Sequence, residues 1–446
     1  MTNILDKELA RRLAELRDRG LYRELRRIDS PQAPRIKVGG QTLLNFSSND
    51  YLGLAAEPAL KEAARQALEQ YGAGAGASRL ICGSLAPHHQ LEEALAAFKG
   101  TEAALSFSTG YAAALGTIGA LAGKGDIVIL DKLVHACIVD AARLSGAKLR
   151  IFGHNDMADL ERLLQWAAER IRGPKSEIRN PKSEARRPEM DGPEFGPNPN
   201  PNLNLKLTPN LEVPLAPGAP SSGGSSVLIV TESIFSMDGD QAPLRELAAL
   251  KEKYGAWLMV DEAHATGLYG RNGRGLAEEL GLGHRIEIQM GTLGKALGAA
   301  GGYICGSRTL IDYLVNRARS FIFSTSPVPA AVAAATAGIH FVQSTAGQAR
   351  RDVLWQRVSE VRSFLAGQGR WPCPSSPACA IIPLMLGQED RTVRASAALR
   401  DQGIFIPAIR YPTVPRGQAR LRLTLTAAHT PADLEELLAA LRSVDF

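Results

Sequence analysis

At 446 residues the chain is too long for one small core, so we expect two domains, or one large domain with a smaller one attached. Hydrophobic residues make up 45% of the sequence and charged residues 22%, as in ordinary soluble proteins, and no apolar run is long enough to cross a membrane. The formal net charge of +5 is too small to indicate nucleic acid binding.

The first 44 residues are predicted to be a short segment that packs against one of the domains. Leucines recur at helical spacing among charges over residues 5–19, which predicts a helix. A proline-containing stretch follows, and then a short strand at residues 35–38. A segment of this length, residues 1–44, cannot build a core of its own.

Residues 45–328 are predicted to form the large domain. Helices are expected at residues 58–70 and 90–98, and short apolar strands at 103–107, 126–130, 148–152, 227–231 and 257–260. Helices separate most of these runs, and short apolar runs are typical of strands buried in a parallel sheet. We therefore predict an α/β fold with a mostly parallel sheet flanked by helices.

Residues 329–446 are predicted to form a smaller C-terminal α+β domain. Helices are expected at residues 330–341, 348–365 and 432–441, and strands at 381–386 and 421–425. Within the large domain, residues 172–226 hold eleven of the 26 prolines and lack apolar periodicity. We predict a disordered surface insertion there, with a partner-binding loop as the alternative.

The chain ends and the cysteines favour a cytoplasmic protein. The first residues are charged and carry no apolar stretch, so no signal peptide is expected. The five cysteines are scattered, and Cys373 and Cys379 are too far apart for a CxxC metal or redox motif. Free thiols in a reducing compartment are expected, and no metal site is predicted.

Lys295 lies among small residues in the run GTLGKALGAAGG at residues 291–302. Glycine and alanine let a planar ligand approach the backbone closely. Burial in such a setting would favour the neutral, nucleophilic amine that forms Schiff bases. Thr292, one helical turn earlier, could donate its hydroxyl to a phosphate. The alternative is a glycine-rich packing loop whose lysine reaches solvent.

The apolar strand predicted at residues 257–260 would place Asp261 at its carboxyl end, where α/β sheets bind ligands. His264 follows on the turn that leaves this strand. The string DEAH also occurs in helicases, but no GxxxxGK[ST] phosphate loop is present, so a helicase is excluded. Asp261 could equally be a helix cap.

Three further runs carry weaker signals. At Ser108-Thr109-Gly110 a strand turns into a helix, whose free N–H groups could bind an anion, while Tyr111 could stack on a planar ring. An ordinary capped turn is the alternative, and His135 alone is more often a core residue than a ligand. The run GAGAGA at residues 72–77 resembles a dinucleotide motif, but a helix is predicted before it instead of a strand, so NAD binding is rejected.

A buried amine, a carboxylate at a strand end and a helix start for a phosphate together describe the needs of pyridoxal phosphate. The chain resembles the α-oxoamine synthases, which are fold-type-I pyridoxal phosphate transferases, over about residues 21–441 without the proline-rich tract. The motifs that carry the resemblance are NFSSNDYLGL at 45–54, FSMDGD at 235–240, DEAHATG at 261–267, TLGK at 292–295, PTVP at 412–415 and ARLRLTLT at 419–426.

The resemblance implies roles for individual residues. Lys295 would form the Schiff base and move the substrate α-proton, Asp261 would bind the pyridinium nitrogen, and His135 would stack over the ring and touch substrate. The other implied cofactor positions are Gly110, Tyr111 (often Phe in the family), Ser236, His264 and Thr292. The implied substrate positions are Arg23, Asn49, His135, Thr413 and Arg422, the last of which suits a carboxylate.

The implied reaction is a decarboxylative condensation of L-alanine with a pimeloyl thioester of CoA or acyl carrier protein. The implied assembly is a homodimer with shared active sites, in which residues 324–326 reach the neighbouring subunit's phosphate. Glycine-using relatives, such as 2-amino-3-ketobutyrate ligase or 5-aminolevulinate synthase, share every cofactor residue and remain an alternative, although residues 231–233 and 413–415 favour the alanine-using member. A non-catalytic protein of this fold would lack Lys295 or Asp261, and both are present.

Overall fold

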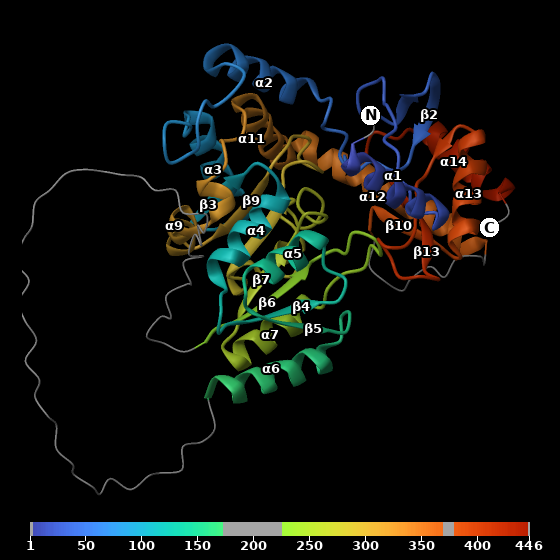
Figure 1. Ribbon diagram of the computed structural model, residues 1–446. Helices are drawn as coiled ribbons and strands as arrows, with labels where there is room; N and C mark the ends of the chain where they lie inside the picture. Colours follow the sequence, from blue (N-terminus) through green and yellow to red (C-terminus); the bar gives the residue numbers. More distant parts are fainter. Residues whose placement is uncertain (1–2, 173–224, 369–378, 445–446) are drawn as a thin grey trace, which may run out of the picture.

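The computed structural model describes residues 3–172, 225–368 and 379–444 (Figure 1). The insertion predicted at residues 172–226 therefore lies outside the described residues, except at its two ends. None of the helices within the described ranges is long and apolar enough to span a membrane.

A seven-stranded sheet forms the centre of the larger body of the molecule (Figure 1). Its strands lie in the order β3 (Ala103–Phe107), β9 (Gly302–Gly306), β8 (Ile288–Thr292), β7 (Trp257–Asp261), β6 (Val227–Glu232), β4 (Ile127–Asp131) and β5 (Lys148–Phe152). Only β9 runs against the others, since it pairs antiparallel with both β3 and β8 while the remaining pairs are parallel. The prediction of a mostly parallel α/β sheet is confirmed.

Helices cover both faces of this sheet because its strands are apolar on both sides. Leu228 and Val230 of β6 pack in one cluster with α4 (Gly110–Leu121), α5 (Ala136–Leu144) and α9 (Arg308–Arg317). Ile229, between them, faces the opposite cluster, which contains α3 (Ala86–Lys99), α6 (Met157–Arg172) and α7 (Leu244–Tyr254). This alternation along one strand is what a sheet buried on two faces requires.

Short helices occur in two connecting segments. α8 (Leu276–Glu279) and the 3-10 helix η1 (Gly283–Arg285) lie between β7 and β8, and α10 (Arg319–Ile322) follows α9. The dinucleotide-like run at residues 72–77 follows the helix α2 (Pro58–Tyr71), whose carboxyl end is capped by Gly72 with φ 79°. A helix precedes this run, as predicted, whereas a dinucleotide-binding motif follows a strand.

The second body is built from the two ends of the chain. One sheet contains β10 (Ile381–Gly387), β13 (Ala419–Thr424) and β12 (Ala408–Ile409), and another contains β1 (Arg35–Val38), β2 (Gln41–Asn45) and β11 (Ile404–Phe405). Because β11 pairs in parallel with β2, the amino-terminal segment is joined to the carboxyl-terminal elements. The helices of this body are α13 (Glu389–Asp401), α14 (Pro431–Ser443) and α1 (Ile4–Asp18).

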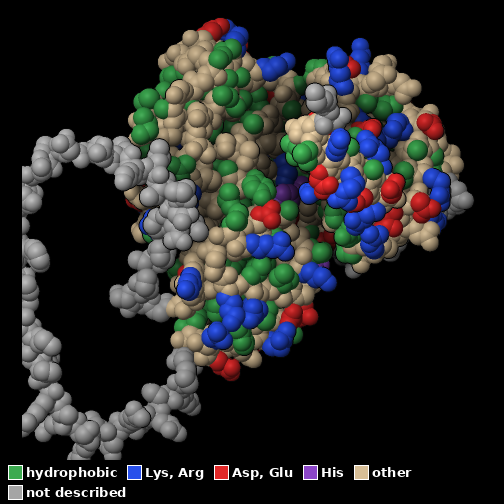
Figure 2. Space-filling model, in the orientation of Figure 1, with side chains coloured by type: hydrophobic (Ala, Val, Ile, Leu, Met, Phe, Trp, Pro, Cys, Tyr) green, Lys and Arg blue, Asp and Glu red, His purple; other side chains and the backbone are tan. Residues whose placement is uncertain are grey.

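Two helices connect the bodies. The helix α11 (Pro329–Gln343) packs against α2 and α3, and α12 (Thr345–Gly367) runs on to α14 (Figure 1). In Figure 2 a furrow lies between the two bodies, lined in part by basic and histidine side chains. The domain boundary at residue 328 stays a prediction.

Candidate active site

Three neighbouring strands deliver polar side chains to one edge of the seven-stranded sheet. β7 ends at Asp261, β6 ends at Glu232, and these two residues are register partners. β8, on the other side of β7, ends at Thr292. Asp261 and Glu232 are only 5% and 2% exposed, so the apolar strands place two carboxyl groups in a nearly dry environment.

Lys295 and His264 meet beside Asp261. Nζ of Lys295 lies 2.8 Å from Nε2 of His264, which stands on the turn after β7 as the sequence predicted. Burial lowers the pKa of Lys295, and this outweighs the opposite effect of the Asp261 and Glu232 carboxylates. The amine is therefore shifted toward the neutral form that a nucleophile requires.

The same burial acts on the neighbouring acid and on the imidazole. It raises the pKa of Asp261, against the attraction of the Lys295 charge. It also lowers the pKa of His264 well below its usual value, with the charges of Lys295 and Arg422 acting in the same direction. His264 is therefore a neutral imidazole, and it lies next to a lysine whose ammonium form is disfavoured by burial.

The backbone between Thr292 and Lys295 is not helical, so the predicted helical turn is wrong. Thr292 ends β8, and bends and a turn follow it. Gly298 and Gly301, with φ of 68° and 127°, adopt conformations that a right-handed helix does not contain. The Thr292 hydroxyl donates to the backbone oxygen of Gly301 (3.0 Å) and accepts from the N–H of Gly294 (3.2 Å).

The amino terminus of α4 lies against Thr292, as a phosphate site would require. Thr109 caps the helix by accepting from the N–H of Ala112 (3.0 Å), as the strand-to-helix turn predicted. A Cβ on Gly110 would lie 3.9 Å from Cβ of Thr292. The first N–H groups of α4 have no partner within the helix and are suited to an anion. Tyr111 is 45% exposed and donates its hydroxyl to Asp140 (2.6 Å).

Arg422 joins three distant segments on the other side of the cluster. It lies on β13 and is 5% exposed. Its Nε donates to the backbone oxygen of Ser236 (2.7 Å), and its Nη1 donates to Oδ1 of Asn49 (3.1 Å). The structure thus brings together three of the predicted residues, from the loop after β2, the loop after β6 and the second body.

His135 stands at the start of α5 and is held by a residue that the sequence analysis did not assign. Its backbone N–H donates to Oε1 of Glu232 (2.6 Å), and its Nδ1 accepts from the N–H of Cys137 (3.2 Å). The Glu232 carboxyl also accepts from the backbone of Ser236. Burial raises the pKa of Glu232 to about 8, and the Asp261 charge adds to this effect. Glu232 ends an apolar strand as Asp261 does, so the same rule could have identified it.

Two predicted substrate residues are not part of this cluster. Arg23 and Thr413 are both exposed, and no hydrogen bond within the described residues joins either side chain to Lys295 or Arg422. The segments that carry them do touch, because the Arg410 side chain, three residues before Thr413, donates to the backbone oxygen of Gly20, three residues before Arg23.

The segment predicted to reach a neighbouring subunit also lies outside the cluster. Ser326 is buried and donates its backbone N–H to Ala77 (3.0 Å), and Thr325 bridges to Ser78. Its contact with a second subunit stays a prediction.

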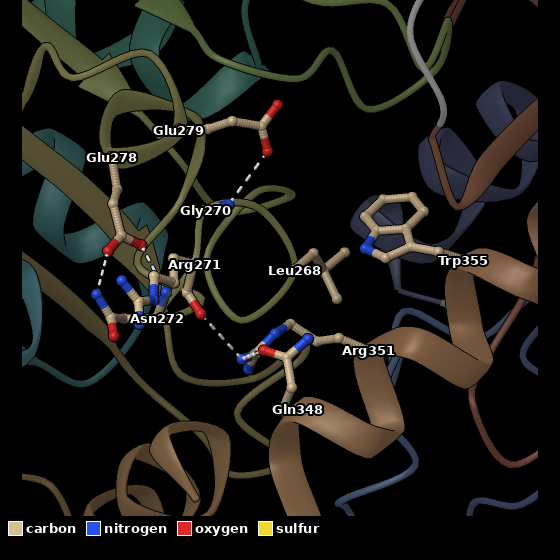
Figure 3. Close-up of a pocket in the computed structure, with 9 residues that line it drawn as sticks. All are labelled: Leu268, Gly270, Arg271, Asn272, Glu278, Glu279, Gln348, Arg351 and Trp355. Carbon is tan, nitrogen blue, oxygen red and sulfur yellow. Dashed lines mark hydrogen bonds between the residues drawn. The ribbon is translucent and has the colours of Figure 1, made fainter. Parts of the chain in front are cut away.

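A separate pocket of about 480 Å³ lies between the loop at residues 268–272 and α12 (Figure 3). Glu278 accepts there from Nδ2 of Asn272 (2.6 Å), and Arg351 donates to the backbone oxygen of Arg271 (3.4 Å). These groups satisfy one another, and none of the predicted site residues lines the pocket. We do not assign it to catalysis. The described residues also contain no cluster of three or more metal-ligating side chains.

Comparison with known proteins agrees with this geometry. The family model for aminotransferase class I and II matches residues 41–175 and 218–441. The 8-amino-7-oxononanoate synthase of Geotalea daltonii is 44% identical over 432 residues, covering 97% of this chain and 96% of that protein. The 8-amino-7-oxononanoate synthase of Geobacter sulfurreducens is 42% identical over 440 residues, covering 99% and 98%.

Solved structures show the same fold. Serine palmitoyltransferase of S. paucimobilis, with a bound PLP–myriocin aldimine, superposes with a TM-score of 0.81 at 29% identity, covering 99% of this chain and 98% of that one. The 8-amino-7-oxononanoate synthase of Francisella tularensis gives a TM-score of 0.65 at 25% identity, covering 90% and 98%. The predicted fold-type-I transferase architecture is therefore confirmed. The chain belongs to the aminotransferase class I and II family and, within it, to the 8-amino-7-oxononanoate synthases, which are acyltransferases of biotin biosynthesis.

Proposed function

We propose that the chain binds pyridoxal phosphate and condenses L-alanine with a pimeloyl thioester, of CoA or of acyl carrier protein, to give 8-amino-7-oxononanoate. The names of the relatives support the reaction, and the serine palmitoyltransferase structure supports the cofactor. The observation that carries the proposal is the contact of the half-buried Lys295 with the buried His264, next to the buried Asp261.

The residues present fit this cofactor. Lys295 offers an amine with a lowered pKa for the Schiff base, and Asp261 offers a buried carboxyl for the ring nitrogen. The first turn of α4, with Thr292 beside it, would hold the phosphate. His264 and Ser236 would contact the cofactor, the histidine at the ring hydroxyl. When bound, the cofactor supplies an electron sink for the carbanion that forms at the amino acid.

The protein groups would bind alanine and move its proton. The Arg422 guanidinium would hold the alanine carboxylate, and Lys295 would take the α-proton. The alanine α-carbon then forms a bond to the thioester carbonyl carbon, the C–S bond breaks, and the thiol leaves. The alanine carboxylate then leaves as carbon dioxide, and a proton, which Lys295 could return, is added to the same carbon to complete the reaction. His135, anchored through its backbone to Glu232, would lie over the ring and restrict its position.

We also propose that the chain works as a cytoplasmic homodimer with residues 324–326 at the neighbouring site. Static light scattering of the purified protein would test the assembly. A mass near twice the chain mass of 47.7 kDa is expected, and a monomer with full activity would contradict it.

Thiol release is the decisive test of the reaction. Purified protein loaded with pyridoxal phosphate is given L-alanine with pimeloyl-CoA and, in parallel, glycine with acetyl-CoA. Release with the alanine pair alone is expected, and release with the glycine pair alone would replace the proposal by the glycine-using alternative. Pimeloyl-acyl carrier protein serves as a second donor. Lys295→Ala, which removes the amine, should abolish both thiol release and the visible absorbance of the Schiff base.

A further inference from the structure

Tyr51 has no role in the site described so far, although its hydroxyl lies inside it. The side chain is 1% exposed, and its hydroxyl oxygen lies 2.7 Å from Nδ1 of His264. It lies farther, at 3.2 Å, from Oδ1 of Asn49. Because Nε2 of His264 contacts Lys295 at 2.8 Å, the imidazole is clamped between the tyrosine and the lysine.

The clamp leaves the imidazole with a choice of tautomer. Burial and the positive charges of Lys295 and Arg422 keep His264 neutral, so the ring carries one N–H and one lone pair. His135 is the other titratable group whose charge acts on this ring. A neutral imidazole that accepts at Nδ1 must donate at Nε2, and the reverse is equally true.

Two observations favour the tyrosine as the donor to Nδ1. The distance to His264 is shorter by half an ångström than the distance to Asn49. Asn49 Oδ1 already accepts from Nη1 of Arg422 (3.1 Å), so its need for a donor is met without Tyr51. Burial also raises the pKa of Tyr51, which keeps the hydroxyl hydrogen in place as a donor.

We propose that Tyr51 is a positioning residue that donates to Nδ1 of His264 and thereby fixes the imidazole with its hydrogen on Nε2, directed toward the cofactor. This inference rests on the proposed binding of pyridoxal phosphate. In the loaded protein, Nε2–H would donate to the ring hydroxyl oxygen and stabilise its anionic form. Tyr51 would act on the reaction only through His264.

The orientation of the His264 imidazole should set the pKa of the Lys295 Schiff base. A hydrogen bond to the anionic ring oxygen stabilises the unprotonated Schiff base, which carries more negative charge, and so lowers its pKa. Tyr51→Phe removes the donor at Nδ1 and lets the imidazole turn its hydrogen away from the cofactor. The loss of one such hydrogen bond should raise the proton affinity about tenfold, or roughly one pKa unit.

The experiment compares two buried tyrosines. The absorbance of the cofactor-loaded protein is titrated with pH, without substrate, for wild type, Tyr51→Phe and Tyr303→Phe. Tyr303 is the matched control, because it is fully buried and its hydroxyl contacts Thr266 (2.7 Å) rather than His264. A raised Schiff-base pKa in Tyr51→Phe alone is expected. An unchanged titration in both variants, or an equal shift in both, would overturn the inference.

A second measurement does not depend on a variant. The ¹⁵N shifts of His264 in the loaded wild-type protein, assigned by loss of the signal in His264→Asn, report which nitrogen carries the hydrogen. Hydrogen on Nε2 is expected, and hydrogen on Nδ1 would overturn the inference even if Tyr51→Phe does not fold. A wild-type protein that forms no Schiff-base absorbance would contradict the proposed function instead.

Discussion

A methyl group added at Gly302 should displace the proposed phosphate site from within the sheet. β9 places Gly302 directly behind the start of α4, and a Cβ there would lie 2.6 Å from the Cα and N of Gly110 and from the backbone oxygen of Thr109. All three atoms belong to the backbone, so no side-chain rotation can relieve the contact. Gly302→Ala must therefore push the first turn of α4 away from Thr292.

The structure allows the size of the effect to be estimated. Overpacking of a buried site by one methyl group costs about 1–3 kcal/mol of unfolding free energy. Gly119→Ala, in the helix α4 that Gly302→Ala would displace, is the control. Gly119 is exposed, and a Cβ there meets nothing within 4 Å. Replacing glycine by alanine in a helix stabilises by about 0.5–1 kcal/mol. The two substitutions are thus expected to change the unfolding free energy in opposite directions.

Urea unfolding of the apo-protein and titration with pyridoxal phosphate would test both parts. Gly302→Ala should lower the unfolding free energy and weaken cofactor binding about tenfold or more, as expected when a charge-assisted hydrogen bond is lost. Gly119→Ala should leave the affinity unchanged. If Gly302→Ala matched Gly119→Ala in both measurements, the first turn of α4 would not depend on the close contact with β9.

Two further predictions concern charged groups outside the Lys295–His264–Asp261 cluster. Lys99→Met leaves Glu262 (0% exposed side chain) without its ion-pair partner and should cost about 3–5 kcal/mol of unfolding free energy, whereas a loss below about 1 kcal/mol would contradict the pairing. Burial alone would lower the pKa of His154, but hydrogen bonds to Asp131 (2.9 Å) and Asp240 (2.7 Å) outweigh it and raise the pKa to about 10. Since the folded pKa exceeds the unfolded value of about 6.5, this stabilisation is complete below pH 6.5 and disappears as the pH rises through about 10. The difference in unfolding free energy between wild type and His154→Gln should therefore shrink from pH 6 to pH 10. A difference that stays constant over this range would refute the prediction.

The sequence predicted the central strands well because their signal is local. The runs at residues 103–107 and 148–152 are strands with those same bounds. The first is apolar except for Ser106, and in the second the basic residues Lys148 and Arg150 alternate with apolar ones, which is a strand pattern readable from neighbouring residues alone. β8 and β9 were not predicted. β9 begins and ends with glycine, and β8 contains Gln289 and Gly291, so neither shows the periodicity of a strand. They are stabilised by pairing with each other and with β3 and β7. Because β3 lies far away in the sequence, this pairing cannot be read from the residues of the two strands themselves.

The same division holds for the site. Asp261 and His264 could be placed from a predicted strand end and the turn that follows it, whereas Thr292 ends β8, a strand that was not predicted. The structure brings all three residues to one edge of the sheet. The contact of Arg422 with Asn49 spans 373 positions of the chain, so only the resemblance to a family could pair them beforehand. The roles of the site residues stay proposals. Tyr51 lies in a quoted motif, yet its contact with His264 depends on a fold that brings together residues 213 positions apart.

The electrostatics of the site point to a ligand with two complementary ends. Burial opposes charge on both Asp261 and Lys295, whereas their mutual attraction, the Glu232 charge on Lys295 and the His135 charge on Asp261 favour the ionised pair. A flat ligand with a cationic nitrogen at one end would restore the Asp261 carboxylate, which burial alone penalises. An electrophilic carbonyl at the other end would consume the Lys295 amine in the neutral form that burial favours. Asp261 ends β7, and Lys295 follows the neighbouring strand β8 by three residues, so both groups lie at the same edge of the sheet. Burial destabilises the charge on each group in the free protein and thereby favours binding of a molecule that satisfies both.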